Sequence, residues 1–591
     1  MCGFYGNLQV RCNDFFVKTN FDVIKYVLLF FIFLNSVVVS SAQIFSVKKY
    51  PKGYFTWPVQ AKKSLVANFG ELRPNHYHMG LDCKTDKKEN VPVYAAADGY
   101  IAKVKIEPYG FGRCIYINHP NGLTTLYAHL NDFNPALEKY ITGQQYQLKS
   151  WKVFLEIPPN LFPVTKGDFI ASSGNTGGSQ GPHVHFEIRD TKTDKVLNPS
   201  LFGLPIADNV APDILRLAVY DRCISTYEQS PKFYTLKKIN GVYATSPALI
   251  ITNTDKVSFG ITAFDRYSAS NNRNGIYEAI LYEDESPVIG FQLDSISYDE
   301  TRYLNAHIDY KLKSSGGPYV QHLSRLGGYS NSIYKPVNGN GVIVIEDDSV
   351  HKIKIEVKDA NGNTSFLKFD VQRGPGVAEK IKKETPPYFN TSFFHPGFIN
   401  LFENDNISFY LPEKALYDSI RFRYNEITPA EGYPIYQLHN TTVPVQVYFP
   451  IKIKALSPLP GKMVMHRFAN YKDDYAKAEY ENGWYKASFR EFGNFQLMVD
   501  TMPPKIVPIG VKEGMNAAKL YRLAFVITDN TEEIKNFTAT LDGNWLRFSN
   551  DKGKTFIYNF DEQCKPGAHE LKIVAEDQVG NVTEKVYHFT R

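Results

Sequence analysis

Two histidines stand one residue apart behind a glycine-rich stretch, in the segment SGNTGGSQGPHVHFEIRD that begins at Ser173. The apolar, β-prone residues that follow predict a strand. Residues two apart along a strand point to the same face, so His183 and His185 present two imidazoles together while Val184 faces the other way. One imidazole of such a pair can bind a metal ion while the other acts on a substrate. Alone, the pair is equally consistent with a solvated strand face.

Two upstream segments add residues of the same chemical kind. HMGLD places His78 and Asp82 four residues apart with a glycine between them, and LYAHL carries His129 at the end of a β run. Zinc binds imidazole nitrogen and carboxylate oxygen at about 2.0–2.2 Å, and a catalytic zinc keeps three protein ligands and one position for water. His78, Asp82 and one member of the pair at 183 and 185 would supply three ligands.

Taken together, these segments resemble the M23 family of zinc metallopeptidases, the lysostaphin and LytM-like peptidoglycan endopeptidases. The resemblance lies in an H-x-x-x-D motif (HMGLD), a Tyr-x-His-Leu element (YAHL) and a glycine-rich loop ending in H-x-H (GNTGGSQGPHVHFEIR), which occur in the family's order. It covers about residues 55–189. The stretch 131–163 is longer than the family's usual link, which leaves the shape of the substrate groove open.

The resemblance implies a role for each of the five residues. His78, Asp82 and His185 correspond to the zinc ligands. His183 corresponds to the catalytic histidine beside the metal, and His129 to the second histidine that positions water or stabilises the transition state. Bound zinc can lower the pKa of its water to near 7 from about 15.7, and histidine can accept or donate a proton at neutral pH. Which histidine is the base stays open.

Neighbouring residues suggest further expectations. Glu187 shares a strand face with His185, so it could orient that imidazole. Cys83 follows Asp82 and should point away from the metal. His76 has no open ligand position to fill, and we expect His119, in the turn NHPNG, to be solvated.

Composition and turn signals predict a mainly β chain. Aromatic residues make up 14% of the 591 residues, and glycine and proline are frequent. We expect a compact antiparallel peptidase domain over residues 47–205. Three strand pairs are predicted there: one around Asp98-Gly99, one around Asn121-Gly122 and one around the glycine-rich loop. The stretch 131–163 reads as an insertion, with a helical turn opened by Asn134-Pro135.

The rest of the chain reads as immunoglobulin-like β-sandwich modules at 208–375, 394–500 and 502–591. An internal repeat supports this division: HKIKIEVKDANGNTSFLKFDV begins at His351 and HELKIVAEDQVGNVTEKVYHF at His569. Both run from an alternating strand through an Asp-x-x-Gly-Asn turn into a second alternating strand. Each repeat lies late in a segment that opens with a proline-containing linker.

The N-terminal segment 1–42 predicts export. Lys25 precedes a 14-residue apolar run, Tyr26–Val39, and small residues follow up to Ala42, as in a cleaved signal peptide. An uncleaved membrane anchor is the alternative. After cleavage four cysteines remain, too few for a disulfide scaffold, and a Cys83–Cys114 bridge is left open.

The net charge of +5 and the lack of a Lys/Arg run argue against nucleic acid as a partner. We therefore expect an exported bacterial protein of the periplasm or cell envelope, a zinc-dependent endopeptidase that cuts peptide cross-links of peptidoglycan in cell-wall remodelling. The alternative is a catalytically silent wall-binding or regulatory protein, with the β modules contacting envelope proteins. The cross-link cut, the partners of the modules and the oligomeric state are left open.

Overall fold

The computed structural model of the chain describes residues 44–46, 48–268, 270–375, 392–430, 432–454 and 461–591. The predicted signal peptide, residues 1–42, lies outside these residues. Within the described residues, no helix is both long and apolar enough to span a bilayer. The prediction of a mainly β chain is confirmed, since nearly all regular structure is strand.

One large antiparallel sheet forms the frame of the N-terminal β domain. Its path begins at β1, continues through β4, β13, β8, β7 and β6, and ends at β10; β11 also pairs with β6, and β14 joins β13 to β21. The strands are β1 (Leu65–Ala67), β4 (Leu81–Lys84), β6 (Gly99–Ile106), β7 (Arg113–Asn118), β8 (Leu123–Ala128), β10 (Val153–Glu156), β11 (Pro163–Val164), β13 (His183–Asp190), β14 (Val196–Leu197) and β21 (Ser295–Ile296).

Two smaller sheets complete this domain, one of three strands and one of two. Their strands are β5 (Pro92–Tyr94), β12 (Phe169–Ser173) and β9 (Leu130–Phe133) in the first, and β2 (Leu72–Arg73) and β3 (His76–Tyr77) in the second. The domain core lies between the sheets and contains fully buried residues such as Val93, Tyr127 and Phe186. One face of the large sheet is thus fixed by apolar packing.

Only one of the three predicted strand pairs forms. β7 and β8 pair across Asn121-Gly122 as expected. The strand before Asp98-Gly99, β5, pairs with β12 in the small sheet, while the strand after it, β6, pairs with β7 in the large sheet. Likewise β12 and β13, on either side of the glycine-rich loop, belong to different sheets. Both turns therefore carry the chain from one sheet to the other.

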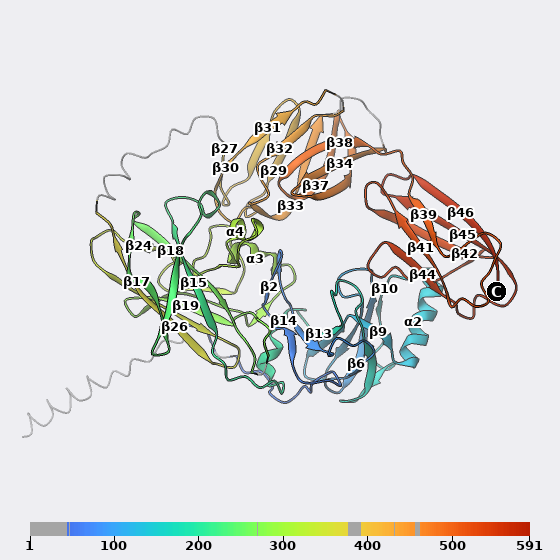
Figure 1. Ribbon diagram of the computed structural model, residues 1–591, viewed down its shortest axis with the longest axis horizontal. Helices are drawn as coiled ribbons and strands as arrows, with labels where there is room; N and C mark the ends of the chain where they lie inside the picture. Colours follow the sequence, from blue (N-terminus) through green and yellow to red (C-terminus); the bar gives the residue numbers. More distant parts are fainter. Residues whose placement is uncertain (1–43, 47, 269, 376–391, 431, 455–460) are drawn as a thin grey trace, which may run out of the picture. The chain divides into compact units, whose positions relative to one another are not determined.

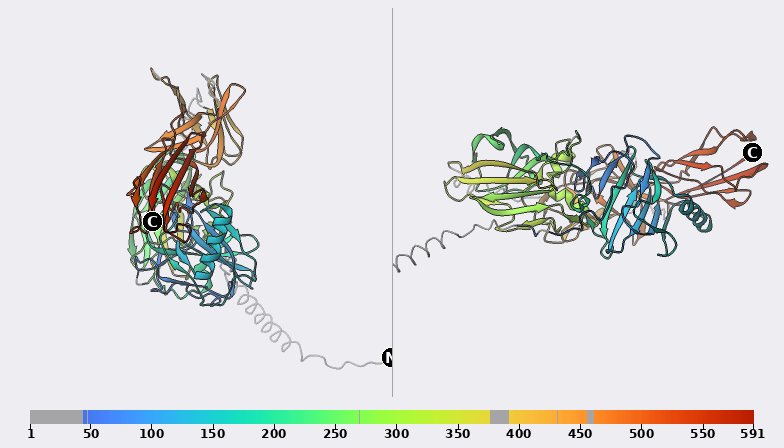
Figure 2. Two further views of the ribbon diagram at one scale, coloured as in Figure 1. Left: turned by 90° about the vertical axis from the view of Figure 1, so that its right-hand side faces the viewer. Right: turned by 90° about the horizontal axis from the view of Figure 1, so that it is seen from below.

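The stretch 131–163 contains helix α2 (Pro135–Leu148), which is longer than the helical turn expected there. Asn134 caps this helix by accepting a hydrogen bond from the Leu137 backbone N–H, and Pro135 occupies the first turn. Figures 1 and 2 show α2 beside the strands of this domain. The strand that follows, β10, pairs with β6 at the end of the large sheet opposite β1 and β4.

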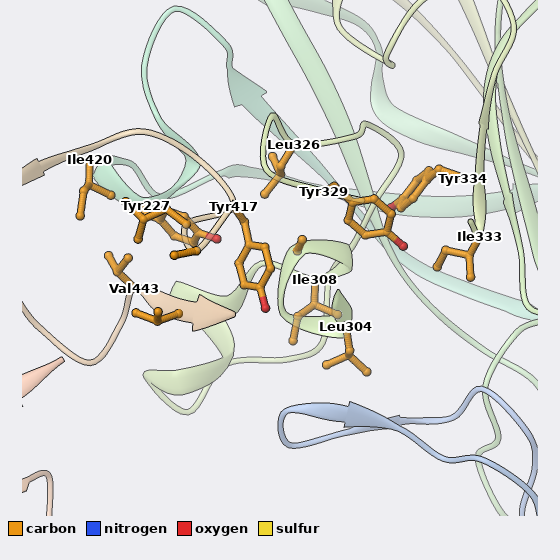
Figure 3. Packing of buried hydrophobic residues seen from close by; sticks show 14 of the residues in the cluster. Tyr227, Leu304, Ile308, Leu326, Tyr329, Ile333, Tyr334, Tyr417, Ile420 and Val443 are labelled. Carbon is orange, nitrogen blue, oxygen red and sulfur yellow. The ribbon is translucent and has the colours of Figure 1, made fainter. Parts of the chain in front are cut away.

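Residues 208–375 form an eleven-stranded sheet with short helices. Its pairs are antiparallel except for β17 with β26. Its elements are β15 (Asp213–Asp221), β16 (Lys232–Ile239), β17 (Val242–Thr252), β18 (Lys256–Phe264), β19 (Glu278–Glu283), β20 (Ser286–Gln292), β22 (Gln321–His322), β23 (Tyr334–Pro336), β24 (Ile343–Val344), β25 (His351–Lys358), β26 (Thr364–Arg373), α3 (Leu304–His307) and α4 (Tyr310–Ser314). Figure 3 shows Tyr329 beside Tyr334 in the hydrophobic core, where their ring centroids lie 5.0 Å apart.

Two further groups of sheets follow. Residues 392–499 hold β27 (Ser392–Phe394), β28 (Asn400–Glu403), β29 (Ile407–Leu411), β30 (Ile420–Phe422), β31 (Tyr424–Ile427), β32 (Ile435–Leu438), β33 (Pro444–Lys454), β34 (Met463–Ala469), β35 (Lys472–Lys477), β36 (Glu479–Glu481), β37 (Trp484–Glu491) and β38 (Gly493–Val499). Residues 505–590 hold β39 (Lys505–Ile509), β40 (Met515–Asn516), β41 (Arg522–Thr528), β42 (Ile534–Leu541), β43 (Asn544–Trp545), β44 (Thr555–Asn559), β45 (Ala568–Asp577) and β46 (Val582–Thr590). The repeated hairpins form as predicted, as β25–β26 and β45–β46.

The four described cysteines, at positions 83, 114, 223 and 564, are all free thiols. The bridge between Cys83 and Cys114 that the sequence left open is therefore not formed. Cys83 packs in the domain core and is fully buried, as strand alternation predicts for the neighbour of Asp82.

Candidate metal centre

Three side chains that are far apart in sequence meet at the paired strands β4 and β13. Asp82 lies directly opposite His185 in the antiparallel register, and His78 reaches the pair from the segment just before β4. His78 Nε2 lies 2.9 Å from Asp82 Oδ1 and 3.0 Å from His185 Nδ1, and His185 Nδ1 lies 2.9 Å from the same Asp82 oxygen. All three residues are buried. The two nitrogens and one oxygen form a nearly equilateral triangle.

Each of the two histidines is oriented by a partner at its other ring nitrogen. His78 Nδ1 lies 2.7 Å from the carbonyl oxygen of Asn68, to which it donates. His185 Nε2 lies 2.9 Å from Glu187 Oε1 and donates to that carboxylate. These bonds leave His78 Nε2 and His185 Nδ1 facing the triangle. A second partner of this kind fixes the tautomer of a metal-binding histidine.

The electrostatics of the triangle follow from burial and close approach. Burial alone would raise the pKa of Asp82, but the imidazoles of His78, His183 and His185 hold it well below its usual range. Burial alone would lower the pKa of His185, yet hydrogen bonds to Asp82 and Glu187 raise it to about 9. The group therefore keeps an ionised carboxylate and a proton on His185, which a metal ion would have to displace.

The donors suit a divalent ion of borderline softness. Two imidazole nitrogens and one carboxylate oxygen are the ligand types of zinc, and three protein ligands leave a fourth position open. Ligands at tetrahedral corners about 2.0–2.1 Å from zinc are roughly 3.3 Å apart, so the observed triangle need open by only a few tenths of an ångström. His78, Asp82 and His185 thus form a group that could hold a metal.

The other two predicted histidines lie beside this group. His183 lies two residues before His185 on β13. Its Nε2 is 3.4 Å from Asp82 Oδ1, and its Nδ1 donates to the Gly181 carbonyl oxygen at 2.8 Å. The ring centroid of His129 lies 4.8 Å from that of His183 and 6.0 Å from that of His185. The fold therefore brings all five residues together.

His129 is held in an unusual conformation. Its φ of 61° lies in the left-handed region, which non-glycine residues seldom adopt. Its Nδ1 donates to the carbonyl oxygen of Thr176, in the glycine-rich loop, at 2.8 Å. Burial and the nearby imidazoles of His183 and His185 lower the pKa of His129 to about 3. The ring is therefore neutral at physiological pH and keeps Nε2 as an acceptor.

Gly80 is required for the close approach of β4 and β13. A Cβ at this position would lie 2.5 Å from the Phe186 carbonyl oxygen and 2.9 Å from two atoms of the His185 ring. Cβ atoms essentially never approach other atoms so closely. The glycine in the HMGLD motif thus lets the imidazole of His185 lie beside the backbone between His78 and Asp82.

Residues behind His185 extend the site beyond what the sequence predicted. Glu187 orients His185, as the strand spacing suggested, and is fully buried. Its other oxygen accepts a hydrogen bond from Arg189 Nε at 2.6 Å, and Tyr298 donates its hydroxyl to Glu187 Oε1 at 2.5 Å. Arg189 continues the two-residue spacing and could have been predicted from it. Tyr298, 111 residues away from Glu187, gave no signal in the sequence.

The two remaining histidines of the domain, His76 and His119, lie outside the triangle. His76 is exposed, donates to the Pro74 carbonyl and is not part of the triangle. The expectation that His119 is solvated is wrong, since only 6% of it is exposed. Its ring lies between the Asp98 carbonyl and the Thr125 hydroxyl, each 2.8 Å away. These partners come from outside the NHPNG turn, so the turn alone could not reveal the burial.

Comparisons with known families agree with this geometry. Residues 76–145 match the family model described as Peptidase family M23, and residues 391–500 match the Zu5-like domain. The chain carries an M23 metallopeptidase region. The matched range contains His78, Asp82 and His129; the pair on β13 lies beyond it. The Zu5-like match covers nearly the range 394–500 that the sequence predicted as its own module.

Relatives resemble the same quarter of the chain. An uncharacterized metalloprotease of Haemophilus influenzae is 31% identical over 163 residues, 26% of this chain and 28% of the relative. Peptidoglycan DD-endopeptidase ShyA of Vibrio cholerae is 27% identical over 27% of this chain and 32% of its own length. The chain thus matches under a third of each of these relatives. Among solved structures, the catalytic domain of lysostaphin from Staphylococcus simulans is 23% identical, with a TM-score of 0.17, over 22% of this chain and 85% of that domain.

Proposed function

We propose that this chain is a zinc-dependent endopeptidase that hydrolyses peptide cross-links of peptidoglycan during cell-wall remodelling. The observation that carries the proposal is the buried triangle of His78, Asp82 and His185, with two further imidazoles at its side. A site that served only to bind the cell wall would have no need of three convergent ligands and two adjacent imidazoles.

In this proposal His78 Nε2, Asp82 Oδ1 and His185 Nδ1 hold the ion. When bound, zinc supplies a water of lowered pKa and polarises the scissile carbonyl. Glu187 fixes the ring of His185 and increases its basicity through the hydrogen bond at Nε2. The bond from Nδ1 to the Gly181 carbonyl makes Nε2, which lies 3.4 Å from Asp82 Oδ1, the nitrogen of His183 that would take a proton and return it to the leaving amine. His129 Nε2, an acceptor, would accept a hydrogen bond from the attacking water and orient it.

The choice of substrate rests on the relatives. ShyA is described as a peptidoglycan DD-endopeptidase. Because it resembles this part of the chain, we propose peptidoglycan as the substrate. Peptidoglycan lies outside the cytoplasmic membrane, so the proposal includes export by a cleaved signal peptide at residues 1–42 and a place in the periplasm or cell envelope.

For the rest of the chain we propose three modules, at 208–375, 394–500 and 502–591, the first and last immunoglobulin-like, following the peptidase domain at 47–205. Their sheets of paired antiparallel strands and the repeated hairpins β25–β26 and β45–β46 support this division. We assign them to spacing the peptidase domain from, or attaching it to, other envelope components.

The test uses the mature chain, residues 43–591, loaded with one equivalent of zinc and incubated with cross-linked muropeptides. Mass spectrometry of the products should show monomers with new amino termini. His183→Ala should keep its zinc and lose activity by about 10²–10⁴-fold, because it removes a proton carrier but none of the three ligands. Asp82→Asn should lose both zinc and cleavage.

His76→Ala is the matched control, because it removes an exposed imidazole two residues from His78 that takes no part in the triangle. This variant should bind zinc and cleave like the wild type. A zinc-loaded wild type that binds sacculi without releasing new amino termini would refute the hydrolase and favour a catalytically silent wall-binding protein.

A further inference from the structure

Three aspartates meet at one end of the sheet formed by residues 208–375, and we call them the first acidic triad. Asp208 lies in the linker before β15, Asp265 directly follows β18, and Asp359 directly follows β25. One carboxylate oxygen from each lies within 4.8 Å of the other two. Two oxygens on opposite sides of a calcium ion are about 4.8 Å apart, since Ca²⁺–O distances are about 2.3–2.6 Å. One ion could therefore contact all three.

Two buried side-chain oxygens without hydrogen-bond partners belong to the triad and to the residue paired with it. Asp265 is only 2% exposed, and its Oδ1 has no hydrogen-bond partner. Asn274 is 3% exposed, and its side-chain oxygen also has none. Asp265 and Asn274 lie directly opposite each other in an antiparallel bridge, so their side chains share one face. A buried oxygen left without a donor destabilises the folded chain, and a bound cation would remove that penalty.

The charge of the triad is not balanced by protein groups. Among the residues that the structure describes, no lysine, arginine or histidine forms an ion pair with any of the three aspartates; the nearest arginine in sequence, Arg266, pairs with Asp213. Burial and the carboxylates of Asp208 and Asp359 raise the pKa of Asp265 to about 8. Three acids are thus held together, one of them in a buried position, without a positive charge.

The same arrangement occurs a second time in the chain. Asp500, Asp529 and Asp577 form a comparable group, from the linker before β39, the end of β41 and the Asp-x-x-Gly-Asn turn after β45. Here too most of the oxygens have partners, since Asp500 accepts from Asn530 and Asp529 Oδ2 accepts from the Thr531 hydroxyl and backbone N–H, but the buried Asp529 Oδ1 has none. The two repeats keep acids at corresponding positions, and each leaves one buried aspartate oxygen without a donor; beside the first, the side-chain oxygen of Asn274 also has none.

We propose that the first acidic triad, with the side-chain oxygen of Asn274, binds one calcium ion. The donors are all oxygen, which suits Ca²⁺ and disfavours zinc, whose protein sites are built mainly from nitrogen and sulfur. Three carboxylates and one amide leave room for water or backbone carbonyls to complete the six to eight ligands of Ca²⁺. The ion ties the linker before β15 to the ends of β18 and β25, and so fixes where this module begins.

The experiment measures calcium bound to the mature chain after chelator treatment, by equilibrium dialysis with ⁴⁵Ca²⁺, and the melting temperature with and without CaCl₂. Asp265→Asn keeps the shape of the side chain and removes one charge. It should bind one calcium ion fewer per chain, or bind it roughly tenfold or more weakly, and lose the calcium-dependent rise in melting temperature. Asp208→Asn should have the same effect. Because Asp208 lies in the linker and is less buried than Asp265, this variant shows whether the loss of calcium arises from the missing ligand or from misfolding.

Asp299→Asn is the control, because it neutralises an exposed carboxylate of the same module that lies outside the triad. It should bind calcium like the wild type. Counting ions per chain separates the first triad from any ion held by Asp500, Asp529 and Asp577. The proposal is overturned if the wild type binds no calcium, or if Asp265→Asn and Asp208→Asn both bind as many ions, as tightly, as the wild type. None of these outcomes depends on peptidase activity.

Discussion

Substitution of Glu187 by glutamine should weaken metal binding without removing any ligand. Glu187 is fully buried and accepts from two sides, from His185 Nε2 at 2.9 Å and from Arg189 Nε at 2.6 Å. Glutamine has only one accepting oxygen. If that oxygen faces Arg189, the amide N–H₂ faces His185 and favours the tautomer with a proton on Nδ1, the ligand atom. If it faces His185, the amide opposes the guanidinium of Arg189.

Loss of such a partner behind a metal-binding histidine typically costs 10–100-fold in affinity, or about 1.4–2.7 kcal/mol. We expect the zinc dissociation constant of Glu187→Gln, measured by competition with a chromogenic chelator, to rise by that factor. Activity at saturating zinc should recover in part, because the three ligands and His183 remain.

The matched control is Asp194→Asn. Asp194 contacts the same guanidinium, with Arg189 Nη1 3.0 Å from its carboxylate, but its side chain is 73% exposed. This variant should bind zinc like the wild type. Melting temperatures of the metal-free variants separate a loss of affinity from a loss of folding. A dissociation constant for Glu187→Gln within twofold of the wild type, in a folded protein, would refute the assigned role of Glu187.

Two further predictions concern packing and pH. Gly80→Ala should lower both zinc affinity and stability, the latter by about 1–3 kcal/mol, because its Cβ would lie 2.5 Å from the Phe186 carbonyl oxygen; zinc titration and thermal melting measure the two effects. Burial lowers the pKa of His307 to about 4 and that of His322 to about 3, below the value of about 6.5 in the unfolded chain. The unfolded state therefore takes up protons first as the pH falls, and the folded state loses about 2 kcal/mol per histidine by pH 5. The fall in melting temperature between pH 7 and pH 5 should therefore be smaller for His322→Gln than for the wild type, and unchanged for His395→Gln, which replaces an exposed histidine.

The sequence was sufficient to predict which side chains of the site lie together where this follows from strand alternation. The two-residue spacing of His183, His185 and Glu187 predicted a shared face, and the structure places the two histidines beside Asp82 and Glu187 behind His185. The four-residue spacing of His78 and Asp82 likewise survives, because Gly80 allows the chain to turn both side chains toward β13. These relations are local, so they need no knowledge of which strands pair.

Predictions that depended on strand partners were less successful. The dipeptide Asp98-Gly99 does form a tight connection, but nothing in it states that β5 pairs with β12 and β6 with β7. The burial of His119 depends on the Asp98 carbonyl and the Thr125 hydroxyl. Residue types at one turn cannot report such contacts, because they are made by segments brought together only when the sheets assemble.

The acceptor bonded to each imidazole sets His185 apart from the other three histidines of the site. His78, His129 and His183 each donate one ring N–H to a neutral backbone carbonyl, whereas His185 donates to the carboxylate of Glu187. A carboxylate acceptor makes an imidazole a more basic ligand, which suits a residue that must hold a cation. His129, with its pKa lowered to about 3, stays neutral throughout the physiological range. We therefore infer that the proton is exchanged by His183, and that His129 acts through a hydrogen bond at Nε2.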